Sequence, residues 1–253
     1  MSDLRTVSDQ MGRKVTFSTS PKRIISLVPS QTEFLVDVGV SVVGRTKFCI
    51  HPADRVTQIP IVGGTKNFRM EVIEKLQPDL IIGNKEENYQ EGIEELAGKY
   101  PVWMSDIASL EDAFEMMDLL GEYCGEKEAA DHLLEECRTS IRSVRKSQSG
   151  KVLYLIWRDP WMAAGRSTFI DQMLSHLGYQ NVAMGDRYPI LTNDEIRQLS
   201  PEIILLSSEP FPFREKHLEE IKKSFPQSEV RLVDGELYSW YGSRLRHWAD
   251  HLN

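Results

Sequence analysis

Few of the residues that could do chemistry stand at the spacing that a reaction or a metal needs. His247 and His251 are four residues apart, which suits metal chelation on a helix. No third potential ligand stands at a sequence spacing typical of a metal site. The stretch Gly63-Gly64-Thr65-Lys66 lacks the four-residue insert between glycines that a Walker phosphate loop requires. We therefore predict neither catalytic residues nor a resident metal.

A third candidate for chemistry is the stretch at 165–168, Gly-Arg-Ser-Thr, which precedes a predicted helix. Free backbone N–H groups at such a position can bind an anion. Ser167 or Thr168 acting as an ordinary helix cap explains the same residues. An enzyme acting on a phosphorylated or metallated cofactor therefore stays open as an alternative hypothesis.

Aromatic and polar side chains instead gather in the loops that follow the predicted strands. Parallel strands present ligands at their carboxyl ends, and rings joined to a few polar groups suit a large flat organic ligand. For any single ring, covering the edge of the sheet is the better explanation. The loops concerned are residues 29–31, 48–51, 84–86, 157–161, 207–211 and 238–241.

The elements that would position these loops form an α/β pattern. Short β-branched runs alternate with helical stretches over residues 22–106, which predicts a parallel sheet covered by helices. A helical segment at 109–149 includes a long stretch from 126 to 146, and a new buried strand starts at 152. We predict an N-terminal α/β lobe at 1–108 and a C-terminal α/β lobe at 150–253. The expected fold is two Rossmann-like lobes with parallel sheets, joined by a long rigid backbone helix.

An internal repeat supports two related lobes. Residues 70–82 align with residues 193–205 without a gap, each as a short helix, a proline and a buried strand. The repeat places Glu71 and Asp194 near the start of the same helix in each half. The helix dipole alone could favour both carboxylates, and they could equally be acidic docking groups for arginines of a partner.

Composition narrows the class of protein. With 27% charged and 41% hydrophobic residues the chain is an ordinary globular protein, and its net charge of -8 argues against nucleic acid as a partner. Its three cysteines have no metal-binding spacing, and no apolar run is long enough for a transmembrane segment. Because no signal peptide is recognisable, we predict a cytoplasmic protein, or a periplasmic or membrane-anchored one if a leader was removed.

Three short segments resemble one family in order and spacing. They are the stretch from Asp9 through Gly12, Arg13 and Pro21 to Thr32-Glu33, then residues 76–81, and then residues 177–182. Together they make the chain similar to the substrate-binding proteins of iron-siderophore, haem and cobalamin ABC importers. The resemblance implies a non-enzymatic protein that needs no cofactor and binds a metal-chelate ligand in the cleft between its lobes for delivery to an importer.

The resemblance also implies roles for particular residues. Glu71 and Asp194 fall where cobalamin-binding members carry two glutamates that dock on permease arginines. Phe48 and Tyr188 match expected aromatic positions, whereas tryptophans of the family's pocket are replaced here by other residues. The ligand is therefore left open among a corrinoid such as cobalamin, a ferric siderophore and haem, and a cytoplasmic carrier or sensor is an alternative role. The predicted ligand-binding residues are Ser30, Phe48, Thr65, Asn84, Trp157, Arg158, Trp161, Arg166, Tyr188 and Trp240.

Overall fold

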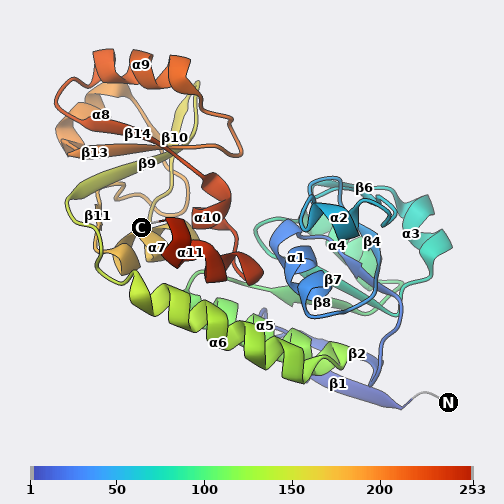
Figure 1. The fold of residues 1–253 in the computed structure, drawn as a ribbon. Coiled ribbons are helices and arrows are strands. Elements are labelled where there is room, and N and C mark those ends of the chain that lie inside the picture. The colour runs from blue at the N-terminus through green and yellow to red at the C-terminus, as the bar shows by residue number, and fades with distance from the viewer. Residues whose placement is uncertain (1–2, 252–253) are drawn as a thin grey trace. The chain divides into compact units, whose positions relative to one another are not determined.

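The chain forms two compact α/β units (Figure 1) in a computed structural model that describes residues 3–251. Unit 1 holds residues 3–107, 111–138 and 241–246, and unit 2 holds the remaining described residues. This division departs from the predicted boundaries in two ways. The helical segment at 109–149 is shared between the units, and residues 241–246 pack with unit 1 although most of the C-terminal half belongs to unit 2.

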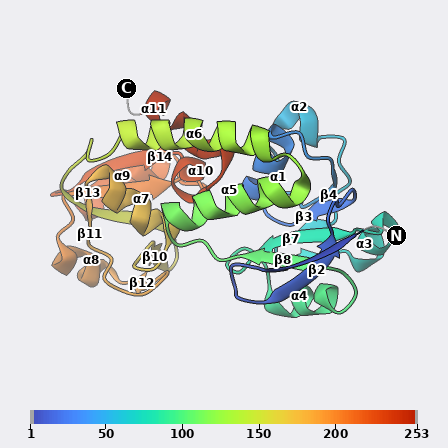
Figure 2. The same ribbon diagram turned by 90° about the horizontal axis from the view of Figure 1, so that it is seen from below.

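Unit 1 is built on a parallel four-stranded sheet in the order β4-β3-β7-β8. The apolar runs form its buried strands, and their side chains pack on Ile73 and Ile93 of the helices over one face, with α1 on the other (Figure 2). The sheet strands are β3 (Ile24–Ser26), β4 (Val42–Arg45), β7 (Leu80–Asn84) and β8 (Val102–Ser105), and the short hairpins are β1 (Leu4–Ser8) with β2 (Lys14–Ser18) and β5 (Gly63–Gly64) with β6 (Asn67–Phe68). The helices are α1 (Pro29–Asp37), α2 (Ala53–Val56), α3 (Met70–Leu76), α4 (Gln90–Ala97), most of α5 (Leu110–Cys124) and the first part of α6 (Lys127–Ser143), with most of the 3₁₀ helix η1 (Ser243–His247).

Unit 2 has a six-stranded sheet with three parallel pairings and two antiparallel ones, both of which involve β10. The predicted parallel pairing is therefore confirmed for β9, β11, β13 and β14, and β10 alone runs in the opposite direction. Asp159 adopts a left-handed conformation at φ 57°, and the turn there sends β10 back along β9. The strands are β9 (Lys151–Trp157), β10 (Trp161–Ala163), β11 (Gln180–Asn181), β12 (Ile190–Leu191), β13 (Ile203–Ser207) and β14 (Glu229–Val233).

The two faces of this sheet are covered by different helices (Figure 1). Leu153 and Leu155 pack with apolar residues of α8 and α9, whereas Tyr154 between them points the other way and meets Tyr238 of α10 at 5.1 Å. This alternation is the two-residue period of a strand that is buried on both faces. The helices of unit 2 are α7 (Phe169–Leu177), α8 (Asn193–Leu199), α9 (Glu215–Ser224), α10 (Gly235–Ser239) and α11 (Trp248–His251).

The predicted repeat is present in three dimensions. Helices α3 and α8 each have seven residues and end on a left-handed residue, Gln77 at φ 45° and Ser200 at φ 47°. The acidic residue before the following strand binds the backbone where a neighbouring strand begins. Asp79 accepts from the N–H groups of Lys22 and Arg23, and Glu202 accepts from that of Lys151. The repeat thus includes an equivalent side-chain to backbone contact in each unit as well as a similar sequence pattern.

Helix α6 carries the chain from unit 1 into unit 2, close to the predicted stretch of 126–146. Within unit 1 it packs tightly against α5 at Gly121, where an added Cβ would lie 2.3 Å from the Cβ of Ala130. A glycine is needed there because any side chain would push the two helices apart.

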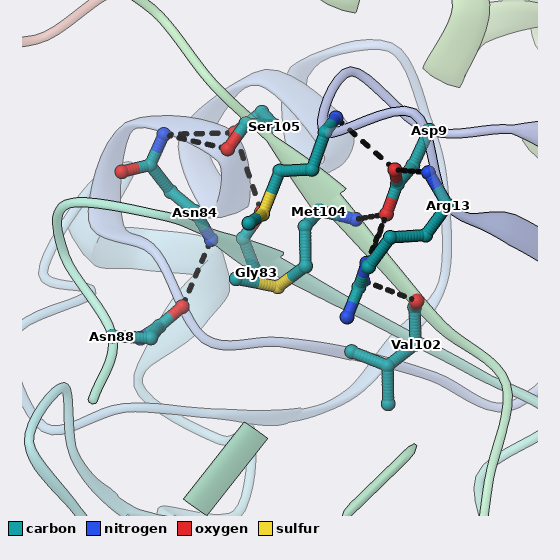
Figure 3. Close-up of polar contacts among 9 residues, drawn as sticks. Asp9, Arg13, Gly83, Asn84, Asn88, Val102, Met104 and Ser105 are labelled. Carbon is teal, nitrogen blue, oxygen red and sulfur yellow. Dashed lines mark hydrogen bonds and ion pairs between the residues drawn. The ribbon is translucent and has the colours of Figure 1, made fainter. Parts of the chain in front are cut away.

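Asp9 fastens the turn between β1 and β2 to the edge of the unit 1 sheet (Figure 3). Its carboxylate, 5% exposed as a residue, accepts from the backbone N–H groups of Met11, Arg13 and Met104 and pairs with the guanidinium of Arg13. The same guanidinium donates to the carbonyl of Val102 at 3.0 Å. One buried acid therefore connects the first hairpin to β8.

Candidate ligand-binding site

In unit 1 the loop after β4 projects two large apolar side chains into solvent. Cys49 is fully buried, and its sulfur lies 3.1 Å from the hydroxyls of both Thr32 and Thr46. Burial raises the pKa of the Cys49 thiol, so the group stays protonated and neutral. With Cys49 anchored inward, its neighbours Phe48 and Ile50 are each 49% exposed. The anchored cysteine thus presents Phe48, a predicted ligand contact, to solvent.

Asn84, another predicted ligand contact, has its side chain engaged within the protein (Figure 3). It is 2% exposed, and its amide group donates to the hydroxyl and the carbonyl of Ser105. Its side-chain oxygen accepts from the backbone N–H groups of Glu86 and Glu87 at 2.8 and 3.1 Å. Asn84 therefore shapes the loop after β7.

The other two predicted contacts of unit 1 are buried as well. Ser30 lies in the first turn of α1 and is 4% exposed. Thr65 is in the turn of the β5–β6 hairpin, and its carbonyl accepts from the side-chain amide of Asn88. In this arrangement Phe48 offers far more surface to a ligand than either of them.

In unit 2, Trp157 ends β9 and is 40% exposed, with its ring packed edge-on against Phe211 at 5.7 Å. The predicted contacts on either side of the following turn are tied to neighbouring helices. Arg158 makes a two-pronged ion pair with Glu220 of α9, at 2.8 and 2.6 Å. The indole N–H of Trp161 donates to the side chain of Asn193 at the start of α8. Their polar groups thus fix the loop around Trp157.

Arg166 and Tyr188 stand in two segments that are joined by backbone hydrogen bonds. The N–H of Gly165 donates to the carbonyl of Arg187 at 2.7 Å, and Arg166 and Arg187 donate to the carbonyls of Gly185 and Arg166. Arg166 is exposed, and its guanidinium donates to the sulfur of Met184 at 3.4 Å. Tyr188 is half-buried. These backbone hydrogen bonds bring Arg166 and Tyr188 into one part of unit 2.

Trp240 is 7% exposed and binds a half-buried acid, Glu209, that we did not predict as a contact. Its indole N–H and the hydroxyl of Ser239 donate to the same oxygen of Glu209, at 2.9 and 2.7 Å. Burial raises the pKa of the Glu209 carboxyl group, and the two hydrogen bonds oppose this shift only in part. Glu209 follows the carboxyl end of β13, and that position is the signal by which the sequence could have revealed it.

The raised pKa of Glu209 makes a pH dependence of stability testable. The folded protein retains the Glu209 proton to a higher pH than the unfolded chain does. Its contribution to stability is therefore fully present below the usual carboxyl pKa of 4.5 and is lost as pH rises through the raised value. We expect Glu209→Gln, which keeps the acceptor oxygen, to be relatively more stable at pH 7 than at pH 4. Thermal melts of both proteins across this range would show no pH-dependent difference if the expectation is wrong.

The two predicted docking residues lie on the surface of their units. Glu71 is in the first turn of α3 and Asp194 in the first turn of α8. The side chain of Asp194 is 84% exposed and pairs with Arg197 one turn later at 2.7 Å. Helix α8 also begins with a capping box between Thr192 and Glu195, so the carboxylate stands on a well-fixed turn.

Two further findings concern residues 3–251 as a whole. No group of three or more histidine, cysteine, aspartate or glutamate side chains is arranged to hold a metal ion there. In the same part of the chain, no helix combines the length and apolar character needed to cross a membrane.

The family follows from comparison with known proteins. A family model described as periplasmic binding protein matches residues 24–228. The chain belongs to this family. A substrate-binding lipoprotein of an ABC transporter, YvrC of Bacillus subtilis, is 26% identical over 215 residues, 79% of this chain and 68% of its own length. A vitamin B12-binding protein of Pectobacterium carotovorum is 23% identical over 201 residues, 75% and 72% of the two chains.

Solved structures confirm the fold of this periplasmic binding protein. The vitamin B12-binding protein BtuF of Vibrio cholerae aligns with a TM-score of 0.78 at 17% identity, covering 92% of this chain and 95% of that one. The expected class, a substrate-binding transport protein with two α/β lobes and no enzymatic activity, is thereby confirmed. The prediction of a cytoplasmic protein is wrong, because the family is periplasmic and the Bacillus relative is a lipoprotein.

Proposed function

We propose that this protein binds a metal-chelate ligand and delivers it to an ABC importer. The observation that carries the proposal is the set of large apolar side chains exposed at the carboxyl ends of strands in both units. Phe48 and Ile50 follow β4, and Trp157 ends β9. Apolar side chains that are exposed together and bordered by polar residues are typical of ligand-binding surfaces, whereas an isolated exposed ring is not.

The class of ligand is supported by the relatives. One relative is the vitamin B12-binding protein of Pectobacterium, and another, similar over 33% of this chain, is a probable siderophore-binding lipoprotein of Bacillus subtilis. A solved structure of similar fold, with a TM-score of 0.77, is a periplasmic haem-binding protein of Pseudomonas aeruginosa. All of these ligands are metal chelates with a large organic body. The exposed rings of this chain suit such a body, which gains stability by covering apolar surface.

Tryptophan fluorescence can test the proposal, because Trp157 is exposed whereas Trp103 and Trp248 are buried. The purified protein would be titrated with cyanocobalamin, haem, ferric citrate and a ferric catecholate, and native mass spectrometry would count the bound ligand. We expect saturable quenching by at least one of them, which Trp157→Phe should reduce. If none of these compounds binds saturably, the proposal is refuted.

We further propose that Glu71 and Asp194 dock on the permease. Both are surface carboxylates at the start of equivalent helices, where arginines of a partner could form two-pronged contacts with them. Glu71→Ala with Asp194→Ala should leave stability within about 0.5 kcal/mol of the parent, as for surface changes generally. Ligand-stimulated ATP hydrolysis by the cognate importer in liposomes should fall sharply. Undiminished stimulation by the double variant would contradict this role.

A further inference from the structure

We propose that the ligand is an anionic metal chelate with an aromatic or macrocyclic body, and that Lys47 and Lys66 bind its acidic groups. The inference rests on the proposed ligand-binding function and narrows it. Lys47 was not among the predicted contacts, and Lys66 was considered only within the stretch that does not match a Walker phosphate loop. Lys47 precedes Phe48 in the loop after β4, and Lys66 stands in the β5–β6 hairpin and binds the loop after β7.

The β5–β6 hairpin contacts Lys47 and carries Lys66 in its turn. The backbone N–H of Lys47 donates to the carbonyl of Gly63 at 2.8 Å. A Cβ added to Gly64 would lie 3.4 Å from the ring of Phe48 and 3.6 Å from Cε of Lys47, so the hairpin packs against both. Lys66 stands in the two-residue turn of the same hairpin. Gly63 makes this tight turn possible, since it has φ +122° and an added Cβ would lie 2.2 Å from the carbonyl of Asn67.

Neither lysine forms an ion pair with a carboxylate among residues 3–251. The ammonium group of Lys47 lies 4.8 Å from the ring centre of Phe48, and that of Lys66 donates to the backbone carbonyl of Glu86. Other lysines of unit 1 differ, since Lys85 pairs with Asp106 and Lys99 with Glu74. An acidic group on a ligand that stacks on Phe48 would therefore find one charge without a counter-charge beside the ring, at Lys47, and another on the hairpin that packs against Phe48, at Lys66.

Unit 2 also carries a cation that forms no ion pair with a carboxylate among the described residues. Arg166 is exposed, and the partner of its guanidinium is the neutral sulfur of Met184, itself 58% exposed. A thioether is a weak acceptor, and a ligand oxyanion would replace it at a gain in electrostatic energy. Each unit thus sets an unpaired cation next to exposed apolar surface. A small inorganic oxyanion would leave that surface unused, and a neutral or cationic chelate would leave the cations unused.

Recognition must come from direct contact rather than from long-range attraction. The chain carries a net charge of -8, and Glu86 and Glu87 lie in the loop next to the hairpin. These charges offset the field of the lysines at a distance. The ammonium groups can still donate hydrogen bonds to oxygens that touch them. We therefore expect the two lysines to change affinity through the lifetime of the complex more than through its rate of formation.

Binding measurements on matched variants test the inference. Haem and a ferric tris-catecholate serve as anionic probes, cyanocobalamin as a neutral one and aquocobinamide as a cationic one, each titrated calorimetrically. The variants are Lys47→Gln with Lys66→Gln, and Lys99→Gln as a control, because Lys99 is paired and lies at the end of α4. We expect an anionic probe to bind best, and the double variant to weaken it by about tenfold or more while the control does not.

The outcomes separate this inference from the function on which it rests. Tightest binding of cyanocobalamin or aquocobinamide, or equal affinity of the parent and the double variant for the anionic probe, would overturn the inference and leave a ligand-binding protein. Failure of all four probes and of ferric citrate to bind would overturn both. Binding of haem but not the catecholate, or the reverse, supports the inference and identifies which anionic chelate is preferred. A melting temperature of the double variant close to that of the parent shows that its fold is intact.

Discussion

Replacement of Gly165 by alanine is expected to lower the free energy of unfolding by about 3 kcal/mol, in the range of an overpacked site that also loses hydrogen bonds. A Cβ at this position would lie 2.2 Å from the carbonyl of Gly185 and 2.9 Å from Pro189. The obstacle is backbone, which cannot rotate away as a side chain can. Chemical denaturation of Gly165→Ala and of the parent would measure the loss.

The same change should also weaken ligand binding, because it separates the segments that carry Arg166 and Tyr188. Relief of the clash must break the short bonds from Gly165 to Arg187 and from Arg166 to Gly185. Gly98→Ala is a matched control, since an added Cβ there meets nothing closer than 3.5 Å and its φ is an ordinary -69°. Equal effects of the two substitutions on stability would contradict the expected role of Gly165.

Asp9→Ala is expected to destabilise unit 1 by about 3 kcal/mol, because the fully buried carboxylate accepts from three backbone N–H groups that its removal would leave unsatisfied. The substitution leaves Arg13 without its counter-charge and removes the acceptor for the N–H of Met104. Because Asp9 joins the first hairpin to β8, we expect the hairpin to exchange its amide protons first. Denaturant titration and hydrogen exchange would measure the two effects.

Glu122→Ala provides the comparison for Asp9. Its carboxylate pairs with Arg5 at 2.9 Å, but both side chains are partly exposed, at 49% and 27%. Exposed pairs contribute little, so we expect a loss of less than about 1 kcal/mol. A similar loss in the two variants would mean that burial of Asp9 is not what makes its ion pair important.

Much of the fold could be predicted from the sequence, because it depends on local periodicity. The strands, the long helix and the repeat at 70–82 and 193–205 follow from the order of apolar residues, prolines and caps. The antiparallel β10 escaped prediction because a strand of three residues carries no direction of its own. Direction is set there by the turn at Asp159, whose conformation depends on its surroundings.

The site was predicted less completely, because residue type and position do not show where a polar group is used. Asn84, Arg158 and Trp161 stand in the expected loops, but their polar groups bind Ser105, Glu220 and Asn193. Those partners are between 21 and 62 residues away along the chain, so no local pattern announces them.

By itself, the sequence determined two related α/β lobes and the equivalent positions of Glu71 and Asp194, since a duplicated pattern fixes both. Only the tertiary structure decided which side chains are left available to contact a ligand. It buried Cys49 so that Phe48 faces solvent, and it folded a hairpin that carries Lys66 and packs against Phe48 and Lys47. It also returned residues 241–246 to unit 1. The physical reason is that burial and pairing depend on contacts between distant segments, which exist only once the chain has folded.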